Sequence, residues 1–502
     1  MDFQVVVVGG GPVGVMVASE LALAGVKACV LEKRKEITPY SRALTLHPRS
    51  LELLDMRGLK EKLENRGGPI PTGHFASLDT RLDFSVLDSA SNYTLFIPQN
   101  ETEEVLEEWA KSLGVDIRRE VEVVSVRQHA EGVEVTGVGP EGEFTLQAAY
   151  VVGADGAGST VRKQTGIPFT GTGDTLTAML GDVVLTELEK PTVLSRYSEQ
   201  GGTMIVPMNS GLHRVIVVDP ERTSVPKSEP VTLEELGASL KKILGTDLGI
   251  SNPRWLSRFG NATRQAERYR EGRIFLAGDA AHIHLPAGGQ GLNVGLQEAV
   301  NLGWKLAAAL KGWAPEWLLD SYHQERMPVN TALLRNTRAQ AVLMASDFSQ
   351  SMGDLRSLLS ELLQIPEANR LLAGQISAFN IRYESDPLAL AHPLNGSRLR
   401  DLKLRTEDGA LHQAYEFFHS GSFVLLHFAG DPTIQGADWS RYPHIKPVFA
   451  SLAEDAADWA DVHTALVRPD GYVAWALSRS ESEPVESVRQ GIARWCGEAG
   501  IL

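Results

Sequence analysis

The segment Gly9-Gly10-Gly11-Pro12-Val13-Gly14 constrains the fold more than any other part of the chain. It follows the β-branched run 5–8 and precedes an apolar helical pattern over 14–24 that stops at Gly25. Glycine at the first, third and sixth positions permits a tight turn, close approach of backbone to a pyrophosphate, and close helix–strand packing. The context is essential, because 47 glycines make a chance match plausible and leave a ligand-free turn as the alternative.

An acidic residue closes the next predicted strand, 26–31, at Glu32. In a dinucleotide-binding βαβ unit, an acid at this place binds a ribose hydroxyl, and the start of the helix offers free N–H groups to the phosphates. The sequence therefore predicts a dinucleotide site at the N-terminus. Its expected cofactor-binding residues are Gly9, Gly11, Pro12, Val13, Gly14, Glu32 and Lys33.

Changes in pattern along the chain predict three domains in an α/β fold. Strand and helix patterns alternate over 1–174 and include a helix expected over 103–113 and a hairpin expected from strands 121–126 and 132–138. A nucleotide-binding pattern returns at 272–279 and leads into a helix expected from about Asn293 to Leu310. Between these stretches, 175–270 reads as an inserted antiparallel sheet. We predict a discontinuous first domain, 1–174 and 271–394, with a helical extension. A small α/β domain is expected over 395–502, with a turn at Pro469-Asp470-Gly471.

Composition narrows the classes of partner. The formal net charge of −15 disfavours binding to nucleic acid or to anionic membranes. The cysteines, Cys29 and Cys496, form no CxxC motif, and we see neither a signal peptide nor a membrane-spanning run. A cytoplasmic location is expected. The pair His282 and His284 lacks a third ligand nearby, so we predict that no metal is bound.

Two later segments carry a family resemblance. The first is Gly153-Ala154-Asp155-Gly156, which follows a predicted strand, and the second is Ala277-Gly278-Asp279 with the glycine-rich stretch 286–293. With them, the chain resembles the class A flavoprotein aromatic hydroxylases, and above all the aromatic polyketide hydroxylases. The resemblance covers 1–330, and the tail around 466–475 is similar to the thioredoxin-like domain of that subgroup, here without CxxC. It implies a Rossmann-like FAD-binding domain with an inserted antiparallel-sheet substrate domain and a thioredoxin-like C-terminal domain.

The same resemblance implies site residues. Asp279 matches the acid that bonds the ribityl chain of FAD, and Arg42 and Gln99 match flavin contacts. Asp155 and Gly156 match a segment near both FAD and NAD(P)H, although a turn residue before a helix would explain Asp155 as well. The expected residues around the flavin ring are Pro286, Gly288, Gly291, Leu292 and Asn293.

The loop at 286–293 has a physical use in such a site. Reduced flavin carries negative charge at the N1–C2 carbonyl region, and a helix beginning near Asn293 would direct the N–H groups of Gly291, Leu292 and Asn293 at it. Glycine lets backbone approach a flat ring, and Pro286 stiffens the approach. We assign no substrate-activating base, and His47 is expected to cap a helix or to pack.

The resemblance implies a monooxygenase that uses FAD, O₂ and NADPH or NADH to hydroxylate a bulky aromatic, polyketide-like substrate through a C4a-hydroperoxyflavin. A Baeyer–Villiger or epoxidising enzyme would share every motif, and a non-catalytic FAD-binding protein is an alternative of another class. A halogenase is disfavoured because the sequence has no WxWxIP segment. Whether the protein is a monomer or a homodimer stays open.

Overall fold

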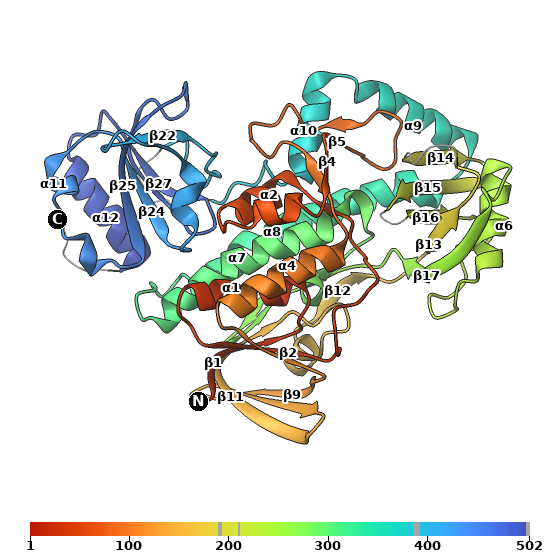
Figure 1. The fold of residues 1–502 in the computed structure, drawn as a ribbon, viewed down its shortest axis with the longest axis horizontal. Helices are drawn as coiled ribbons and strands as arrows, with labels where there is room; N and C mark the ends of the chain where they lie inside the picture. Colours follow the sequence, from red (N-terminus) through yellow and green to blue (C-terminus); the bar gives the residue numbers. More distant parts are fainter. Residues whose placement is uncertain (189–192, 209–210, 385–391, 498–502) are drawn as a thin grey trace.

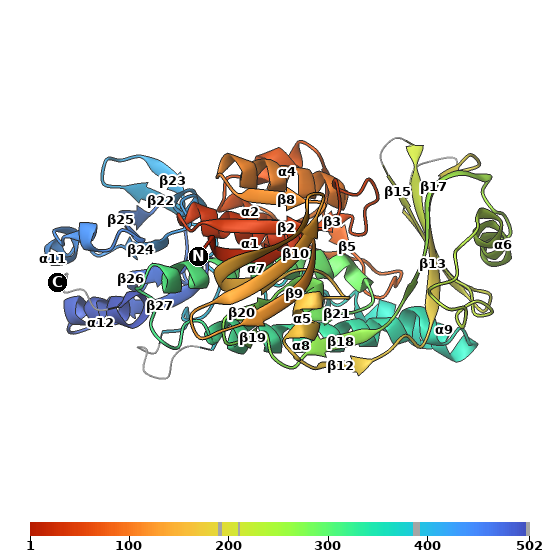
Figure 2. The ribbon, with the colours of Figure 1, turned by 90° about the horizontal axis from the view of Figure 1, so that it is seen from below.

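The structure, a computed structural model, describes residues 1–188, 193–208, 211–384 and 392–497. Three units lie in a row: a sheet-and-helix body in the middle, an antiparallel sheet with α6 at one end, and the C-terminal unit at the other (Figures 1 and 2). Within the described ranges, none of the helices combines the length and the apolar character needed to cross a bilayer.

A parallel sheet forms the centre of the middle unit, in the strand order β20-β11-β1-β2-β8. Because these strands run parallel, their carboxyl ends lie at one edge of the sheet, where ligands of such sheets bind. The predicted βαβ unit is therefore confirmed, although its second strand starts two residues later than expected. The bounds are β1 Phe3–Val8, β2 Ala28–Glu32, β8 Asp116–Arg119, β11 Gly142–Gly153 and β20 Ile274–Leu276.

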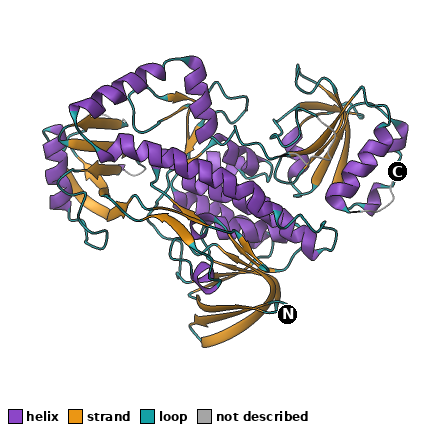
Figure 3. Cartoon of the chain, turned by 180° about the vertical axis from the view of Figure 1, so that it is seen from behind, coloured by secondary structure: helices purple, strands orange, loops and turns teal. Residues whose placement is uncertain are grey.

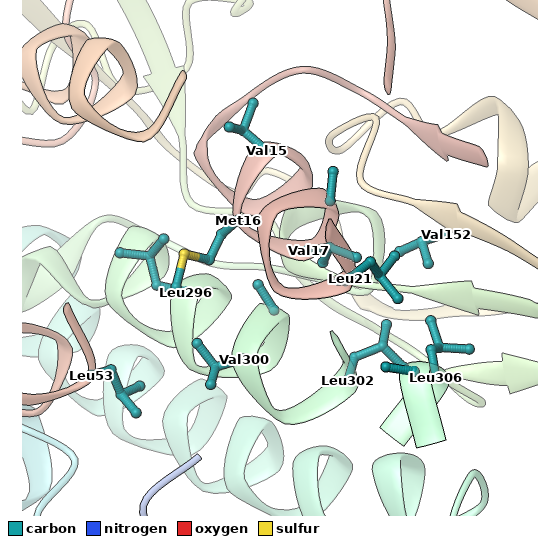
Figure 4. Close-up of a cluster of buried hydrophobic side chains, with 14 of the residues drawn as sticks. Val15, Met16, Val17, Leu21, Leu53, Val152, Leu296, Val300, Leu302 and Leu306 are labelled. Carbon is teal, nitrogen blue, oxygen red and sulfur yellow. The ribbon is translucent and has the colours of Figure 1, made fainter. Parts of the chain in front are cut away.

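Two helices fill the core against this sheet. Helix α1 (Pro12–Leu23) packs along α7 (Gln290–Leu310), and Figure 4 shows Met16 and Leu21 of α1 beside Leu296 and Leu306 of α7. Helix α1 is apolar on all sides and is buried continuously from Gly14 to Leu21, and α7 is buried over most of its length. Our predicted start of α7 near Asn293 is wrong by three residues, because Gly291 lies inside its first turn and the loop glycines are Gly288 and Gly289.

The predicted hairpin and first-domain helix are also present. Strands β9 (Glu122–Gln128) and β10 (Val133–Gly139) pair antiparallel, and β10 continues onto β11. The remaining elements of this half are α2 Pro48–Asp55, α3 Lys60–Glu64, α4 Gln99–Ser112, α5 Thr160–Gln164, β3 Thr45–Leu46, β4 Gly68–Ile70, β5 Thr72–Gly73, β6 Leu82–Asp83 and β7 Thr94–Phe96.

An antiparallel sheet occupies most of 177–260, in the order β14-β15-β16-β13-β17. Helix α6 (Leu233–Leu244) covers one face with an apolar stripe. A separate three-stranded sheet, β12-β18-β21, leads the chain into and out of this unit. The bounds are β12 Phe169–Thr172, β13 Thr177–Leu185, β14 Leu194–Ser198, β15 Gly201–Pro207, β16 His213–Val218, β17 Ile250–Gly260, β18 Thr263–Ala266, β19 Arg270–Glu271 and β21 His282–Ile283.

The stretch after α7 is mostly helical, as predicted, and its long helix crosses the back of the molecule (Figure 3). It comprises α8 Ser321–Ala341, α9 Gln350–Leu362 and α10 Pro366–Ile376. The C-terminal unit has a six-stranded sheet, β23-β22-β25-β24-β26-β27, flanked by helices. Its bounds are β22 Lys403–Thr406, β23 Leu411–Gln413, β24 Phe423–His427, β25 Ile445–Leu452, β26 Val462–Val467, β27 Val473–Ser478, α11 Pro432–Gln435 and α12 Pro484–Cys496.

Candidate active site

The three motif glycines after β1 have different physical reasons. A Cβ at Gly14 would lie 2.0 Å from the carbonyl oxygen of Gly9, and one at Gly9 would lie 2.3 Å from that of Ala154. Both glycines are therefore required by close backbone packing. At Gly11, in contrast, a Cβ would meet nothing within 4 Å, so protein packing does not explain this glycine and an external group approaching the backbone does.

The start of α1 is open to an anion. Gly11 is the N-cap residue and offers no capping side chain, and Pro12 occupies the first turn, which holds no acidic residue. The free N–H groups there attract phosphate oxygens, so these residues fit the pyrophosphate of a dinucleotide. The side chain of Val13 packs beneath the next strand-end turn, 3.1 Å from the Cβ position of Gly278.

Glu32 stands at the end of β2, beside this turn. Its carboxylate accepts hydrogen bonds from the N–H of Gly10 at 2.6 Å and of Arg34 at 2.9 Å. The buried carboxylate thereby fixes the glycine turn against the neighbouring strand, and it lies where a ribose would bind. Lys33 is exposed at the same edge.

Asp279 follows β20 at that edge and is exposed between buried neighbours. Within the described residues its carboxylate has no hydrogen-bond partner, so it can bind a ligand hydroxyl. The turn that carries it is fixed by Glu298 of α7, which accepts from the N–H of Gly278 at 2.7 Å and bonds Nε2 of His282 at 2.9 Å. Burial would raise the pKa of Glu298, but His282 and Arg326 outweigh it and lower that pKa.

This geometry also accounts for the histidine pair. The Nε2 of His282 bonds the carboxylate of Glu298, and the Nδ1 of His284 bonds the carbonyl of Leu285 at 2.7 Å. In the parts of the chain that the structure describes, no group of three His, Cys, Asp or Glu side chains is placed to hold a metal ion. Sequence reasoning missed Glu298, although an acid on the apolar face of a helix is a recognisable signal.

The glycine-rich loop ends at the N-terminus of α7. Pro286 is exposed at its start, and Gly288 and Gly289 have φ of +71° and +66°, a left-handed conformation that favours glycine. Because α7 begins at Gln290, the unpaired N–H groups belong to Gln290, Gly291 and Leu292. The expected set Gly291, Leu292 and Asn293 is thus shifted by one residue.

Asn293 contributes its side chain instead of its N–H. Its Oδ1 accepts from the N–H of His47 at 2.7 Å, and its Nδ2 donates to the carbonyls of Thr45 at 3.1 Å and Gly289 at 2.9 Å. The side chain therefore joins the segment before α2 to the loop before α7. Together these two segments form a rigid backbone edge that suits a flat, polar ring.

Gln99 holds the segment that carries Arg42. Its Oε1 accepts from the N–H of Ala43 at 3.1 Å, and its own N–H donates to the carbonyl of Ala43 at 3.0 Å. The side chain of Arg42 is exposed, while its carbonyl accepts from Arg214 at 2.9 Å. Gln99 thus positions the segment, and the exposed side chain of Arg42 can meet a ligand.

Arg214 is a second residue that the sequence analysis missed. It pairs with Asp182 at 2.8 Å inside the antiparallel sheet and also donates to the carbonyl of Ser41. Both side chains are almost fully buried. The pair therefore fixes the antiparallel sheet to the 41–43 segment. The signal available in the sequence was an acid and a base, each within a β-branched strand, where an unpaired charge would be costly to bury.

Asp155 lies at the same sheet edge, but its carboxylate is occupied by protein groups. It accepts from the Oγ of Ser159 at 2.5 Å and from the N–H groups of Thr160 at 2.6 Å and Val161 at 3.2 Å. These contacts agree with the alternative of a turn residue before a helix. Gly156 next to it has φ of +79° and open space at its Cβ position.

A cavity of about 430 Å³ lies at the opposite end of α1 from Gly11, lined by Ala22, Gly25 and Lys27 among others. None of the expected cofactor residues lines it. The open edge formed by Gly11, Asp279 and the loop before α7 suits an extended dinucleotide, and so indicates a dinucleotide-dependent oxidoreductase of the Rossmann type.

Comparison with known proteins makes the class specific. The FAD-binding domain family matches residues 2–337, and the family of C-terminal domains of aromatic-ring hydroxylases matches residues 392–499. The chain therefore belongs to the FAD-dependent aromatic-ring hydroxylases, which are monooxygenases. The expectations of an FAD cofactor and of a monooxygenase are confirmed.

Three relatives resemble the chain over its whole length. The uncharacterized aromatic compound monooxygenase YhjG of Bacillus subtilis is 54% identical over 496 residues, 99% of this chain and 98% of that protein. A rifampicin monooxygenase of Streptomyces venezuelae is 44% identical over 507 residues, 99% of each chain. The structure of OxyS, an anhydrotetracycline hydroxylase from Streptomyces rimosus, is 43% identical, with a TM-score of 0.91 and 100% of both chains covered.

Proposed function

We propose that the protein hydroxylates a polycyclic, phenol-bearing substrate of the polyketide type, with NADPH or NADH as electron donor. The overall reaction consumes substrate, O₂, NAD(P)H and a proton, and yields hydroxylated substrate, water and NAD(P)⁺. The observation that supports this proposal most is that Gly11, Asp279 and the loop before α7 lie at the same edge of the sheet. Relatives named for rifampicin and anhydrotetracycline support the substrate class.

The cofactor-holding roles that we propose follow the geometry of the edge. Gly11, Pro12 and Val13 would hold the pyrophosphate at the start of α1, and Asp279 the ribityl hydroxyls. The ring would lie against the 286–292 loop, with Arg42 nearby. Bound FAD supplies the transfer of a hydride equivalent from the nicotinamide and the activation of O₂.

The chain itself supplies charge, position and exclusion of water. The N–H groups of Gln290, Gly291 and Leu292 would stabilise negative charge on a ligand bound at the start of α7. The antiparallel sheet, proposed to span 175–270 as a substrate domain, would cover the ring face from the side of β15 and β16. A dry site matters because water would divert oxygen to peroxide.

The test uses purified holoenzyme with anhydrotetracycline and with rifampicin. We expect NAD(P)H oxidation to accelerate with a suitable aromatic compound, and the product to gain one oxygen atom derived from isotopically labelled dioxygen. Product structure separates hydroxylation from ring expansion or epoxidation. A Gly11→Val variant, which should lack FAD, is the matched control. Failure of NADPH and NADH to reduce the flavin under any condition would refute the proposal.

A further inference from the structure

His47 is a buried imidazole with two unpaired ring nitrogens. The residue is 4% exposed, and neither Nδ1 nor Nε2 has a hydrogen-bond partner among the described residues. Its backbone N–H donates to the Oδ1 of Asn293 in the first turn of α7. Buried polar groups in native proteins are almost always paired, so an unpaired ring needs an explanation.

The ring stands between the glycine loop and an apolar cluster. A Cβ at Gly289 would lie 3.4 Å from Nε2 of His47, and the ring of Phe84 meets the imidazole edge-on with centroids 6.1 Å apart. Phe84 belongs to a buried cluster that includes Ile376, whose Cδ1 lies 3.3 Å from the Cβ position of Gly288. His47 thus lies at the junction of the loop proposed to hold the flavin and this buried apolar cluster.

The imidazole is neutral at neutral pH. Burial lowers the pKa of His47 to about 4, although polar contacts of the ring with the backbone of Gly288 and Gly289 oppose this change. The nearby His74 also has a pKa lowered to about 4, by burial first and then by Arg81 and His47. A neutral imidazole has one donor and one acceptor nitrogen. It can therefore accept a bond from a hydroxyl and donate one to a carbonyl, the two groups that a phenol or enol beside a carbonyl presents.

We propose that His47 determines specificity by hydrogen bonding the hydroxyl of a phenolic or enolic substrate beside the 286–289 loop. This inference rests on the proposed function and names the substrate feature that the site reads. The bond to Asn293 comes from the backbone, which any residue except proline supplies, so it survives a change of the ring. A change of the ring should therefore alter substrate recognition and leave FAD binding in place.

The experiment compares two probes that differ in one hydroxyl, 1-naphthol and 1-methoxynaphthalene. Their dissociation constants are measured on the holoenzyme from the change in flavin absorbance, and the dissociation constant of FAD is measured from its fluorescence. The variants are His47→Leu, which removes both nitrogens, and His47→Asn, which keeps a donor and an acceptor. Phe84→Leu is the control, because it changes packing at the same place without removing a polar group.

We expect the wild-type protein to prefer 1-naphthol by about tenfold, the effect of one buried hydrogen bond. His47→Leu should abolish this preference, His47→Asn should retain part of it, and Phe84→Leu should weaken both probes alike. FAD affinity should stay within about twofold in both His47 variants. Equal affinity for the two probes in wild type, a preference that survives in His47→Leu, or a parallel loss of FAD would overturn the inference.

The same preparations separate this inference from the proposed function. A wild-type protein that hydroxylates an aromatic compound while His47→Leu keeps the hydroxyl preference refutes only the role of His47. A wild-type protein that reduces its flavin but oxygenates no aromatic compound refutes the proposed function itself.

Discussion

Arg468 and His47 are both buried polar residues, yet their surroundings are opposite. Arg468 of the C-terminal unit donates four hydrogen bonds, two to Glu325 and two to Asp470, at 2.5–3.0 Å. His47 has no partner for either ring nitrogen among the described residues. A saturated charged cluster holds a structure together, whereas an unpaired buried group of this kind is a candidate for binding a ligand. On our proposal, the first region serves stability and the second serves recognition.

The saturated cluster joins the C-terminal unit to the helices that approach the flavin edge. The turn at 469–471 presents its backbone carbonyls to α2 and the residues after it: Arg49 donates to Asp470 and Arg57 to Pro469. On the other side, Lys305 of α7 pairs with Glu325 of α8 at 2.8 Å. The predicted turn at Pro469-Asp470-Gly471 is thus confirmed, and it serves as the contact point between the domains.

Breaking the saturated cluster should have the largest effect. Arg468→Leu leaves the carboxylates of Glu325 and Asp470 buried with fewer partners, which costs about 3–5 kcal/mol of stability. We expect poor accumulation or a marked fall in the thermal midpoint, measured by calorimetry of the holoenzyme. Arg489→Ala, which removes an exposed pair with Glu486, is the control and should change the midpoint little. Equal midpoints in the two variants would contradict this role of Arg468.

A substitution at the flavin edge should remove the cofactor and spare the fold. Gly11→Val adds a side chain where no atom lies within 4 Å, so the apoprotein should fold normally. The side chain would occupy the space of the pyrophosphate, and FAD affinity should fall by about a hundredfold or more, measured by fluorescence titration. Gly14→Ala is the matched variant, since its Cβ would strike the Gly9 carbonyl and should destabilise the apoprotein as well. A yellow Gly11→Val holoenzyme would refute the assignment.

The two regions should respond to acid in different pH ranges. Burial would raise the pKa of Glu325, but Arg468 and Lys305 lower it to about 2, so its contribution to stability is lost as the pH falls from 4.5 toward 2. His47 stays neutral when folded down to about pH 4, so the unfolded chain binds the extra proton between pH 6.5 and 4. Its contribution is therefore lost as the pH falls through that range.

His47→Leu should lower the slope of the unfolding free energy against pH between pH 4 and 6.5. The reduction should correspond to at most about one proton taken up on unfolding. The buried histidines His74, His427 and His444, whose pKa values are also lowered to about 4, should keep the rest of the slope. The measurement is the unfolding free energy from urea titrations between pH 4 and 6.5. An unchanged slope in the variant would show that His47 is already charged or solvated in the folded protein.

The sequence predicted the elements that local pattern determines. The β1–α1–β2 unit, the 122–139 hairpin and the turn at 469–471 follow from periodicity and glycine placement. It could not predict which polar groups meet across the fold. Arg214 reaches the carbonyls of Ser41 and Arg42 across more than 170 residues of chain, and only the assembled sheet brings them together. The sequence places the start of α7 too late, because Gly291 is indistinguishable from the loop glycines in sequence, although it lies in the helix.

Asp155 gives the smallest expected effect and distinguishes a cap from a cofactor contact. Its carboxylate accepts from Ser159, Thr160 and Val161, so Asp155→Asn should cost about 1 kcal/mol or less of stability, because the amide oxygen still accepts. The KM for NADPH and the dissociation constant of FAD should change by less than about threefold. A tenfold rise in the KM for NADPH with an unchanged thermal midpoint would instead place the nicotinamide donor beside α5, and would make Asp155 a ligand-facing residue like His47.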